Sequence, residues 1–220
     1  MSKEKKIYDD DWMYSVDRLV VDWDIHRSFR HYKCIGTEKI PQHGAIILAP
    51  NHCCALMDPL AALAINHRKK VFVARADVFK KSFFRKILTF LKIMPINRRR
   101  DGIRTVLNTE ATIEKSIEVL ENDVWFCIMP EGTHRAMHSL LPIGKGIARI
   151  AYGAYERIND GRPVYIVPIG CEYGDYFRYR SSLLVQIGDP INVTQYIEQN
   201  KDMSEHDLMQ GLREMTSEAL

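Results

Sequence analysis

Strand-like and helix-like segments alternate along most of this chain of 220 residues. Six short apolar runs are typical of strands, at residues 45–49, 70–74, 93–96, 124–129, 164–171 and 183–187. Five other segments have helical spacing or helix-start signals, at residues 59–67, 79–91, 103–121, 146–158 and 204–218. This alternation predicts an α/β fold in which helices flank a mixed, mostly parallel sheet.

The first thirty residues are predicted to form a separate helical segment, because Trp12, Val16, Leu19, Val20 and Trp23 share one face at helical spacing. We therefore divide the chain into an N-terminal helical segment, residues 1–36, and a larger domain, residues 37–220. No stretch approaches the roughly 20 apolar residues that span a bilayer. Residues 1–17 are too charged for a secretory signal. We expect a protein that does not cross a membrane.

The cysteine pattern is typical of a reducing compartment. The five cysteines are odd in number, and no two have the Cys-x-x-Cys spacing of a structural zinc site. We therefore expect free thiols and no metal site.

Positive charge is concentrated in one part of the chain. Residues 66–104 contain 13 lysines and arginines against two aspartates, an excess of 11 positive charges. Since the whole chain carries a net charge of +3, the remainder carries −8. Such a concentration implies an anionic partner, which could be nucleic acid, a phosphorylated substrate or an anionic membrane.

Polar clusters follow three of the predicted strands. Asn51-His52 follows the first strand, Asn97-Arg98 the third and Glu131-Gly132-Thr133 the fourth. Ligands bind at the carboxyl ends of strands in open α/β sheets, so we expect these loops to converge on one site.

His52 and Asp58 are residue types that can act as a general base and its orienting group. Histidine titrates near neutrality, and a carboxylate can fix its tautomer and stabilise the imidazolium. Asp58-Pro59 is also an ordinary helix start, with Asp at the cap and Pro at the first helical position. These residues alone leave both interpretations open.

Four short motifs occur in a fixed order along the larger domain. They are Asn51-His52 with Asp58, then Met94-Pro95-Ile96-Asn97-Arg98, then Met129-Pro130-Glu131-Gly132-Thr133, then Ile166-Val167-Pro168-Ile169. Together they resemble the glycerolipid acyltransferases, the family of lysophosphatidic acid and glycerol-3-phosphate acyltransferases. The resemblance extends from about residue 40 to residue 190 and identifies residues 37–220 as a glycerolipid acyltransferase domain. Any one motif alone would be weak, but the ordered set is specific.

The resemblance implies a reaction. His52 would deprotonate the acceptor hydroxyl of a phosphorylated glycerol while Asp58 orients the imidazole. The hydroxyl would then attack the thioester of an acyl donor and release a thiol. No metal, cofactor or covalent acyl-enzyme is implied, and acyl-CoA or acyl-carrier protein would be the co-substrate.

The resemblance also implies residues that bind the acceptor. Arg98 would bind its phosphate, because the planar guanidinium can hold two phosphate oxygens. Glu131-Gly132-Thr133 would shape the acceptor site and place backbone donors near the phosphate or oxyanion. The family usually has Arg directly after Thr, whereas here His134 takes that place, so we carry the role over to Arg135. Arg75, after a strand in the basic segment, is a further candidate phosphate ligand.

Two other features depart from the family pattern. Five residues separate His52 from Asp58, where the family commonly has four. The longer spacing resembles a branch that acylates glycerol 3-phosphate or dihydroxyacetone phosphate first, so the acylated position stays open. We also expect no membrane helix before the first motif, where the family commonly has one.

Residues 79–94 combine an apolar stripe with lysines and arginines. The segment is either a core-facing helix with a solvated basic face or an interfacial helix on anionic lipid. An enzyme with lipid products and no spanning segment needs such a contact. We therefore expect a cytoplasmic protein, peripheral on the inner face of the cytoplasmic membrane.

Two other functional classes remain. A non-enzymatic basic module could bind anionic membrane or nucleic acid, but it would leave His52, Asp58 and Glu131 unexplained. The sequence also lacks helix-turn-helix, RRM and zinc-finger patterns, so we expect no nucleic-acid partner. A thioesterase-like hydrolase would use the same donor but transfer the acyl group to water.

Overall fold

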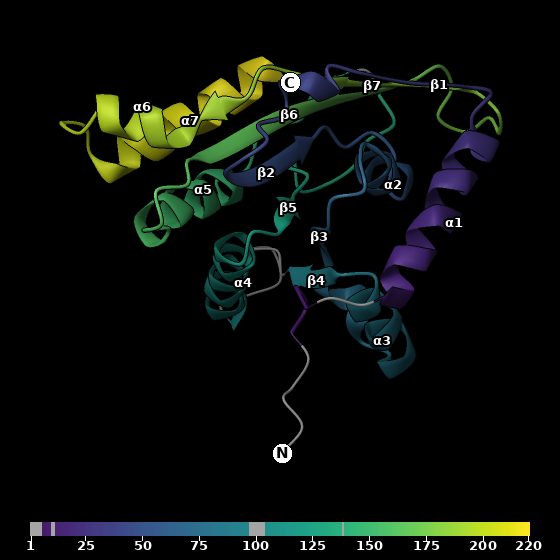
Figure 1. The fold of residues 1–220 in the computed structure, drawn as a ribbon, viewed down its shortest axis with the longest axis horizontal. Coiled ribbons are helices and arrows are strands. Elements are labelled where there is room, and N and C mark those ends of the chain that lie inside the picture. Colours follow the sequence, from purple (N-terminus) through teal and green to yellow (C-terminus); the bar gives the residue numbers. More distant parts are fainter. Residues whose placement is uncertain (1–5, 10–11, 97–103, 138) are drawn as a thin grey trace.

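An eight-stranded sheet is the centre of the fold in the residues that the structure describes, 6–9, 12–96, 104–137 and 139–220 (Figure 1). The computed structural model gives the strands β1 (His31–Ile35), β2 (Ala45–Pro50), β3 (Lys70–Arg75), β4 (Ile93–Ile96), β5 (Trp125–Cys127), β6 (Val164–Tyr173), β7 (Ser182–Ile187) and β8 (Ile191–Asn192). Their order is β1-β7-β6-β2-β5-β3-β4, and β8 pairs with β6. Strand β6 is antiparallel to β7 and β8, whereas the other neighbouring pairs are parallel. The predicted mixed, mostly parallel sheet is confirmed.

Helices cover both faces of this sheet. They are α1 (Trp12–Ser28), α2 (Met57–Ala64), α3 (Ser82–Phe90), α4 (Arg104–Glu121), α5 (Gly146–Arg157), α6 (Val193–Gln199) and α7 (Glu205–Ala219), with short 3-10 turns η1 (Thr37–Lys39) and η2 (Ala76–Phe79). Helices α4 to α7 lie on one side and α1 and α2 on the other (Figure 1). Within the described ranges, every helix is too short or too polar to span a bilayer.

Strand β2 shows how the sequence builds this layered core. All six of its residues are buried, because helices cover both faces of a parallel sheet. Ile47 packs in the cluster beneath α4 and α5, whereas Ile46 and Leu48 pack in the cluster beneath α1 and α2. The strand therefore sits at the centre of the core, and its last residue, Pro50, leads directly into Asn51-His52.

The N-terminal segment contributes to the sheet as well as forming a helix. Helix α1 accounts for the predicted helical pattern, but residues 31–35 of the expected segment 1–36 form β1, which pairs in parallel with β7. Strand β1 lies at the edge of the sheet, and neither it nor β8 nor α6 was predicted from the sequence.

A buried cation joins α1, α2 and β3. Lys70 is fully buried, and its Nζ donates hydrogen bonds to four oxygens: Leu63 O at 3.3 Å, Asn66 O at 2.7 Å, Asn66 Oδ1 at 2.8 Å and Arg68 O at 3.2 Å. Arg18 of α1 is also buried and donates to Asn66 O at 3.0 Å. Burial lowers the pKa of Lys70 to about 7. This polar cluster fixes the inner side of α1 against the loop between α2 and β3.

Candidate active site

Asn51 anchors the loop that follows β2. Its side chain accepts a hydrogen bond from the backbone N–H of Cys171 at 2.7 Å and donates one to the Cys171 carbonyl at 3.3 Å. Its own backbone N–H bonds to Ile169 O at 3.0 Å. Because these partners lie in β6, the loop is fixed at the carboxyl edge of the sheet, and His52 is held there.

His52 and Asp58 form the expected pair. Nδ1 of His52 lies 2.8 Å from Oδ2 of Asp58, and the side chains are 14% and 0% exposed. Helix α2 begins at Met57, with Leu56 at its cap, so Asp58 lies in the first turn and is not the cap residue. Oδ2 also accepts the backbone N–H of Cys54 at 2.7 Å. With Nδ1 held by a buried carboxylate, Nε2 of His52 is the nitrogen left to exchange a proton.

A buried tyrosine completes the surroundings of Asp58. Tyr173, the last residue of β6, donates its hydroxyl hydrogen bond to Oδ1 of Asp58 at 2.6 Å. Burial, and secondarily the charge of Asp58, strongly raises the pKa of Tyr173, so the phenol keeps its proton. Sequence analysis did not identify this residue. Alternation along β6 would place Tyr173 on the same face as Ile169 and Cys171, but no motif marks it.

Glu131 holds the third motif against the histidine loop. Its Oε1 accepts the backbone N–H of His52 at 2.6 Å, and its Oε2 accepts the backbone N–H of Leu141 at 2.8 Å. The backbone N–H of Arg135 donates a hydrogen bond to His52 O at 3.1 Å. Glu131 therefore lies at the site, where its carboxylate accepts hydrogen bonds from two backbone N–H groups.

The turn after Glu131 is open to solvent. Gly132 has a φ of 66°, a left-handed conformation that glycine adopts without strain. Thr133, His134 and Arg135 are exposed, and the rings of His134 and His52 meet edge to face with centroids 5.3 Å apart. The Arg135 guanidinium donates to Ser139 Oγ at 2.7 Å. This turn therefore places the His134 imidazole against His52 and bonds the backbone of Arg135 to the His52 carbonyl.

Of the predicted phosphate ligands Arg98 and Arg75, the structure describes only Arg75. Arg98 lies outside the residues that the structure describes. Arg75 is described, and its exposed guanidinium makes two hydrogen bonds to the carboxylate of Asp77, at 3.1 Å and 2.7 Å. Arg75 is therefore engaged by its own neighbour through Nε and Nη2.

Cys53, next to His52, has the properties of a packed thiol. Burial raises its pKa, whereas a nucleophilic cysteine requires a lowered one. Within the described ranges, no three His, Cys, Asp or Glu side chains converge as a metal site.

Comparisons with known proteins show the family of the chain. A family model described as Acyltransferase matches residues 31–172. In Saccharomyces cerevisiae, glycerol-3-phosphate O-acyltransferase 1 is 38% identical over 66 residues, and glycerol-3-phosphate O-acyltransferase 2 is 32% identical over 111 residues. These matches cover 30% and 50% of the chain but 9% and 15% of the yeast proteins.

One solved structure shares the fold. The crystal structure of the 1-acyl-sn-glycerophosphate acyltransferase PlsC from Thermotoga maritima aligns with a TM-score of 0.63 at 21% sequence identity. The alignment covers 93% of this chain and 77% of that one. Since the family model spans more than half of the chain, the chain belongs to the Acyltransferase family. The family and the PlsC-like fold place it among the glycerolipid acyltransferases.

Proposed function

We propose that the protein transfers a fatty acyl chain from a thioester donor, acyl-CoA or acyl-carrier protein, to a hydroxyl of a glycerol phosphate in phospholipid synthesis. The observation that carries this proposal is the pair formed by His52 Nδ1 and the buried Asp58 carboxylate, 2.8 Å apart at the carboxyl end of β2. Asp58 is fully buried, and its two other hydrogen-bond partners in the described residues, the Cys54 backbone N–H and the Tyr173 hydroxyl, are neutral. Such a carboxylate is well suited to stabilise an imidazolium.

The proposed reaction needs only this pair and two substrates. Nε2 of His52 takes the proton of the acceptor hydroxyl while the oxygen attacks the thioester carbonyl. The tetrahedral oxyanion collapses to the ester and breaks the carbon–sulfur bond. The thiolate leaves and takes the proton from the imidazolium, so the histidine returns to its neutral form. Asp58 stabilises the charged imidazole between the two proton transfers.

The acceptor is proposed to bind on the open turn beside His52. Arg98 would bind its phosphate, with Arg135 and Arg75 as further ligands, and Gly132 and Thr133 would line the approach. Gly132, Thr133 and Arg135 are exposed, and the backbone of Arg135 bonds to the His52 carbonyl, which supports this arrangement. Glu131 would act on the acceptor site through the backbone that it holds.

Two acceptors are proposed, glycerol 3-phosphate and lysophosphatidate. The names of the yeast relatives favour the first, and the name of the Thermotoga maritima protein favours the second. The spacing of five residues between His52 and Asp58 is a further reason to test glycerol 3-phosphate.

We also propose that the protein works as a peripheral protein on the inner face of the cytoplasmic membrane. Among the described side chains of α3, none is buried, and Phe83 and Ile87 are exposed next to exposed Lys80, Arg85 and Lys86. These exposures favour the interfacial interpretation of α3 over the core-facing one.

The experiment that tests the reaction is thiol release from palmitoyl-CoA with glycerol 3-phosphate, lysophosphatidate, dihydroxyacetone phosphate or no acceptor. Release that requires one acceptor supports transfer, and His52→Ala should lower it by roughly 10²–10⁴-fold while the protein stays folded. Equal release without acceptor would indicate a thioesterase. The protein would be a basic binding module if it is folded, releases no thiol from acyl-CoA or acyl-carrier protein, and shifts nucleic acid in a salt-dependent gel.

A further inference from the structure

The imidazole of His134 lies against that of His52. The ring centroids are 5.3 Å apart and the ring planes are inclined by 68°, which is an edge-to-face contact. Asp58 holds Nδ1 of His52 from the buried side, whereas His134 is exposed and meets the ring from the solvent side. Substrates also reach His52 from solvent, so a side chain that contacts the ring there is close to the atoms that react.

The backbone around His134 is fixed to the histidine loop on both sides. Before it in the chain, Glu131 accepts the backbone N–H of His52 at 2.6 Å. Directly after it, the backbone N–H of Arg135 donates to His52 O at 3.1 Å. His134 lies between these two hydrogen bonds, and its side chain is therefore held next to the base although it is exposed.

The nitrogens of the His134 ring are not used within the described part of the chain. The edge-to-face contact with His52 is the one side-chain interaction that the ring makes there. A neutral imidazole carries one N–H and an imidazolium carries two, so the ring can donate a hydrogen bond on either side of neutral pH. Because the ring is exposed, this donor is available to a substrate that displaces water from it.

Other donors around His52 are already bound within the protein. The Asn51 amide donates to a backbone carbonyl of β6 at 3.3 Å, and the Tyr173 hydroxyl donates to a buried carboxylate at 2.6 Å. The backbone N–H of Gly132 donates to a carbonyl of its own turn at 3.1 Å. These groups fix the loops of the site, whereas the His134 ring has its donor free for a substrate.

The proposed transfer develops negative charge beside His52. The oxygen that gives its proton to Nε2 forms a bond to the thioester carbon, and the carbonyl oxygen of that carbon becomes an oxyanion. The oxyanion is thus two bonds away from the atom that His52 deprotonates. Hydrogen-bond donors aimed at such an oxyanion are among the largest contributions to the rate of acyl transfer.

We propose that His134 is a second catalytic residue, whose imidazole N–H donates a hydrogen bond to the oxyanion of the tetrahedral intermediate. The inference rests on the proposed function, because it concerns the same transfer. Both proton transfers stay with His52: it takes the hydroxyl proton and then gives it to the leaving thiolate, while His134 keeps its own proton throughout. The hydrogen bond strengthens as the carbonyl oxygen gains charge, so it favours the transition state over the bound thioester.

Substitutions at His134 separate its donor from its ring. His134→Phe keeps an aromatic ring and removes both nitrogens, whereas His134→Gln and His134→Asn remove the ring and keep an N–H near the positions of Nε2 and Nδ1. With palmitoyl-CoA and the acceptor that supports transfer, kcat should fall on the order of 10²-fold in His134→Phe. At least one of the two amide variants should stay within about tenfold of the wild type. Both KM values should change little in all three variants.

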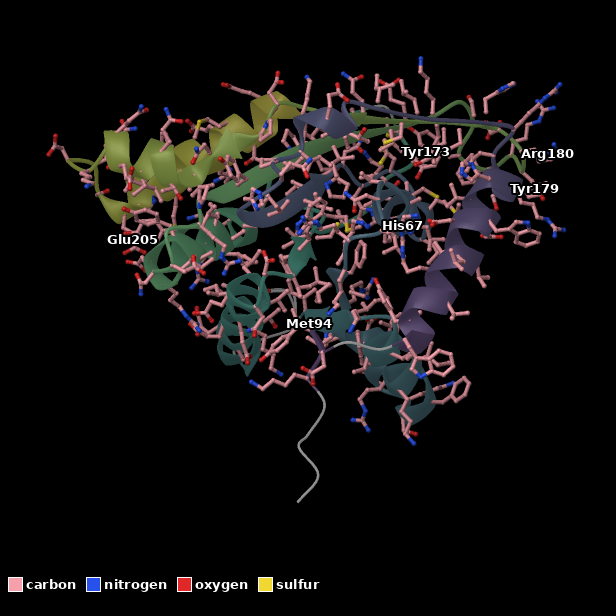
Figure 2. All side chains as sticks on the ribbon, in the orientation of Figure 1. His67, Met94, Tyr173, Tyr179, Arg180 and Glu205 are labelled. Carbon is pink, nitrogen blue, oxygen red and sulfur yellow. The ribbon has the colours of Figure 1, made fainter. Side chains whose placement is uncertain are left out.

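His206→Phe is the matched control. It makes the same change at a histidine of α7 whose side chain is 75% exposed. Figure 2 shows Glu205, the residue before His206, at the other end of the molecule from Tyr173, which binds Asp58 at the site. This control should keep the kinetics of the wild type. The thermal midpoints of the His134 variants should stay near that of the wild type, because the side chain is exposed.

Three results would overturn the proposal. Wild-type kcat in a folded His134→Phe protein would show that the nitrogens of His134 take no part in the reaction. Equal losses in the phenylalanine variant and in both amide variants would show that an N–H donor is not what the site needs. A rise in the acceptor KM at unchanged kcat would assign His134 to the acceptor phosphate.

A second acyl donor distinguishes the oxyanion from the leaving sulfur. The S-phenyl thioester of palmitic acid releases thiophenolate, which is a weaker base than the thiolate of CoA and needs less help from a proton donor. A hydrogen bond to the oxyanion predicts that His134→Phe slows both thioesters by similar factors. A loss that disappears with the phenyl thioester would assign His134 to the sulfur and overturn the proposal.

The proposed function and this inference fail separately. If the wild type transfers the acyl chain and His134→Phe transfers it equally well, the inference alone is wrong. If thiol release needs no acceptor, the proposed function is wrong. Hydrolysis passes through the same kind of oxyanion, so slower hydrolysis in His134→Phe than in the better amide variant would still support the role of His134. A wild type that releases no thiol from either thioester overturns both.

Discussion

Tyr173 donates a hydrogen bond of 2.6 Å to Asp58, across 115 positions of the sequence. Oδ1 of Asp58 accepts the hydrogen bond of this phenol. Oδ2 accepts hydrogen bonds from Nδ1 of His52 and from the backbone N–H of Cys54. The carboxylate is thus held from both oxygens and has little freedom to rotate. Because α2 supplies Asp58 and β6 supplies Tyr173, the contact fixes the helix to the sheet at the level of His52.

Tyr173→Phe should lower turnover and change its pH dependence. Loss of the phenol leaves more negative charge on Asp58, which then holds the imidazole proton more tightly. The acidic limb of the kcat profile should move to higher pH, and kcat should fall while both KM values change little. The unpaired Oδ1 should also cost about 1–3 kcal/mol of folding free energy.

Tyr176→Phe is the matched control for that change. Tyr176 lies three residues further along the chain, packs its ring 5.6 Å from that of Tyr173, and has Cys53 as the side-chain hydrogen-bond partner of its hydroxyl. Activity measured across pH in both variants distinguishes the two roles. An unchanged pH profile in a folded Tyr173→Phe protein would show that the tyrosine only packs.

Glu131→Gln should lower kcat and stability while it leaves the acceptor KM nearly unchanged. The carboxylate accepts the backbone N–H groups of His52 and Leu141, and an amide can accept only one of them. The histidine loop would lose a support, and kcat should fall on the order of tenfold, the effect of about 1.4 kcal/mol. Thr133→Ala is the control on the same turn. A rise in the acceptor KM with unchanged stability would mean that Glu131 contacts the substrate itself.

Arg98→Ala should raise the KM for the phosphorylated acceptor and leave the KM for the acyl donor nearly unchanged. A charge-assisted hydrogen bond contributes about 1.5–3 kcal/mol, so the acceptor KM should rise roughly tenfold or more. Arg75→Ala is the comparison, because its guanidinium already pairs with Asp77. Steady-state kinetics with each substrate varied separately decide the matter. An effect confined to the donor would assign Arg98 to the thioester carrier.

The parts of the site that could be predicted from the sequence are those whose residues lie close together in the chain. His52 and Asp58 were identified because six positions separate them and their chemistry is visible in the residue types. The partners of Glu131 and Tyr173 could not be predicted, because the backbone of His52 is 79 positions from Glu131 and Asp58 is 115 from Tyr173. Only the packing of β2, β5 and β6 side by side brings such groups together.

Strand β1 and helix α1 show two further limits. Residues 31–35 lack a clear apolar alternation, and their strand forms because β7 provides a parallel partner about 150 positions away. For α1, helical spacing located the face formed by Trp12 to Trp23. Periodicity shows that an apolar face exists but not what covers it, and the structure places this one in solvent.

The last prediction concerns the buried amine of Lys70. Burial lowers its pKa in the folded protein from 10.5 to about 7. Below pH 7, both the folded and the unfolded chain carry the proton, and the cost of the buried charge is fully present. Between these two pKa values, the unfolded chain binds the proton and the folded protein has released it, so the free energy of unfolding should rise with pH. Above the unfolded pKa, neither state is charged and the rise stops.

Urea unfolding at pH 6, 7, 8 and 9 measures this effect in the wild type and in Lys70→Met. Methionine removes the Nζ donor from Leu63 O, Asn66 Oδ1 and Arg68 O, whereas Asn66 O keeps Arg18, so the variant should be less stable at every pH. Its stability should nevertheless rise less with pH, by up to about 1.4 kcal/mol per pH unit, because the titrating amine is gone. Lys39→Met, at an exposed lysine, should keep the wild-type slope. The four oxygens around Nζ favour the charged amine and oppose the effect of burial. Equal slopes in Lys70→Met and wild type would show that these hydrogen bonds dominate and that Lys70 stays protonated in the folded protein.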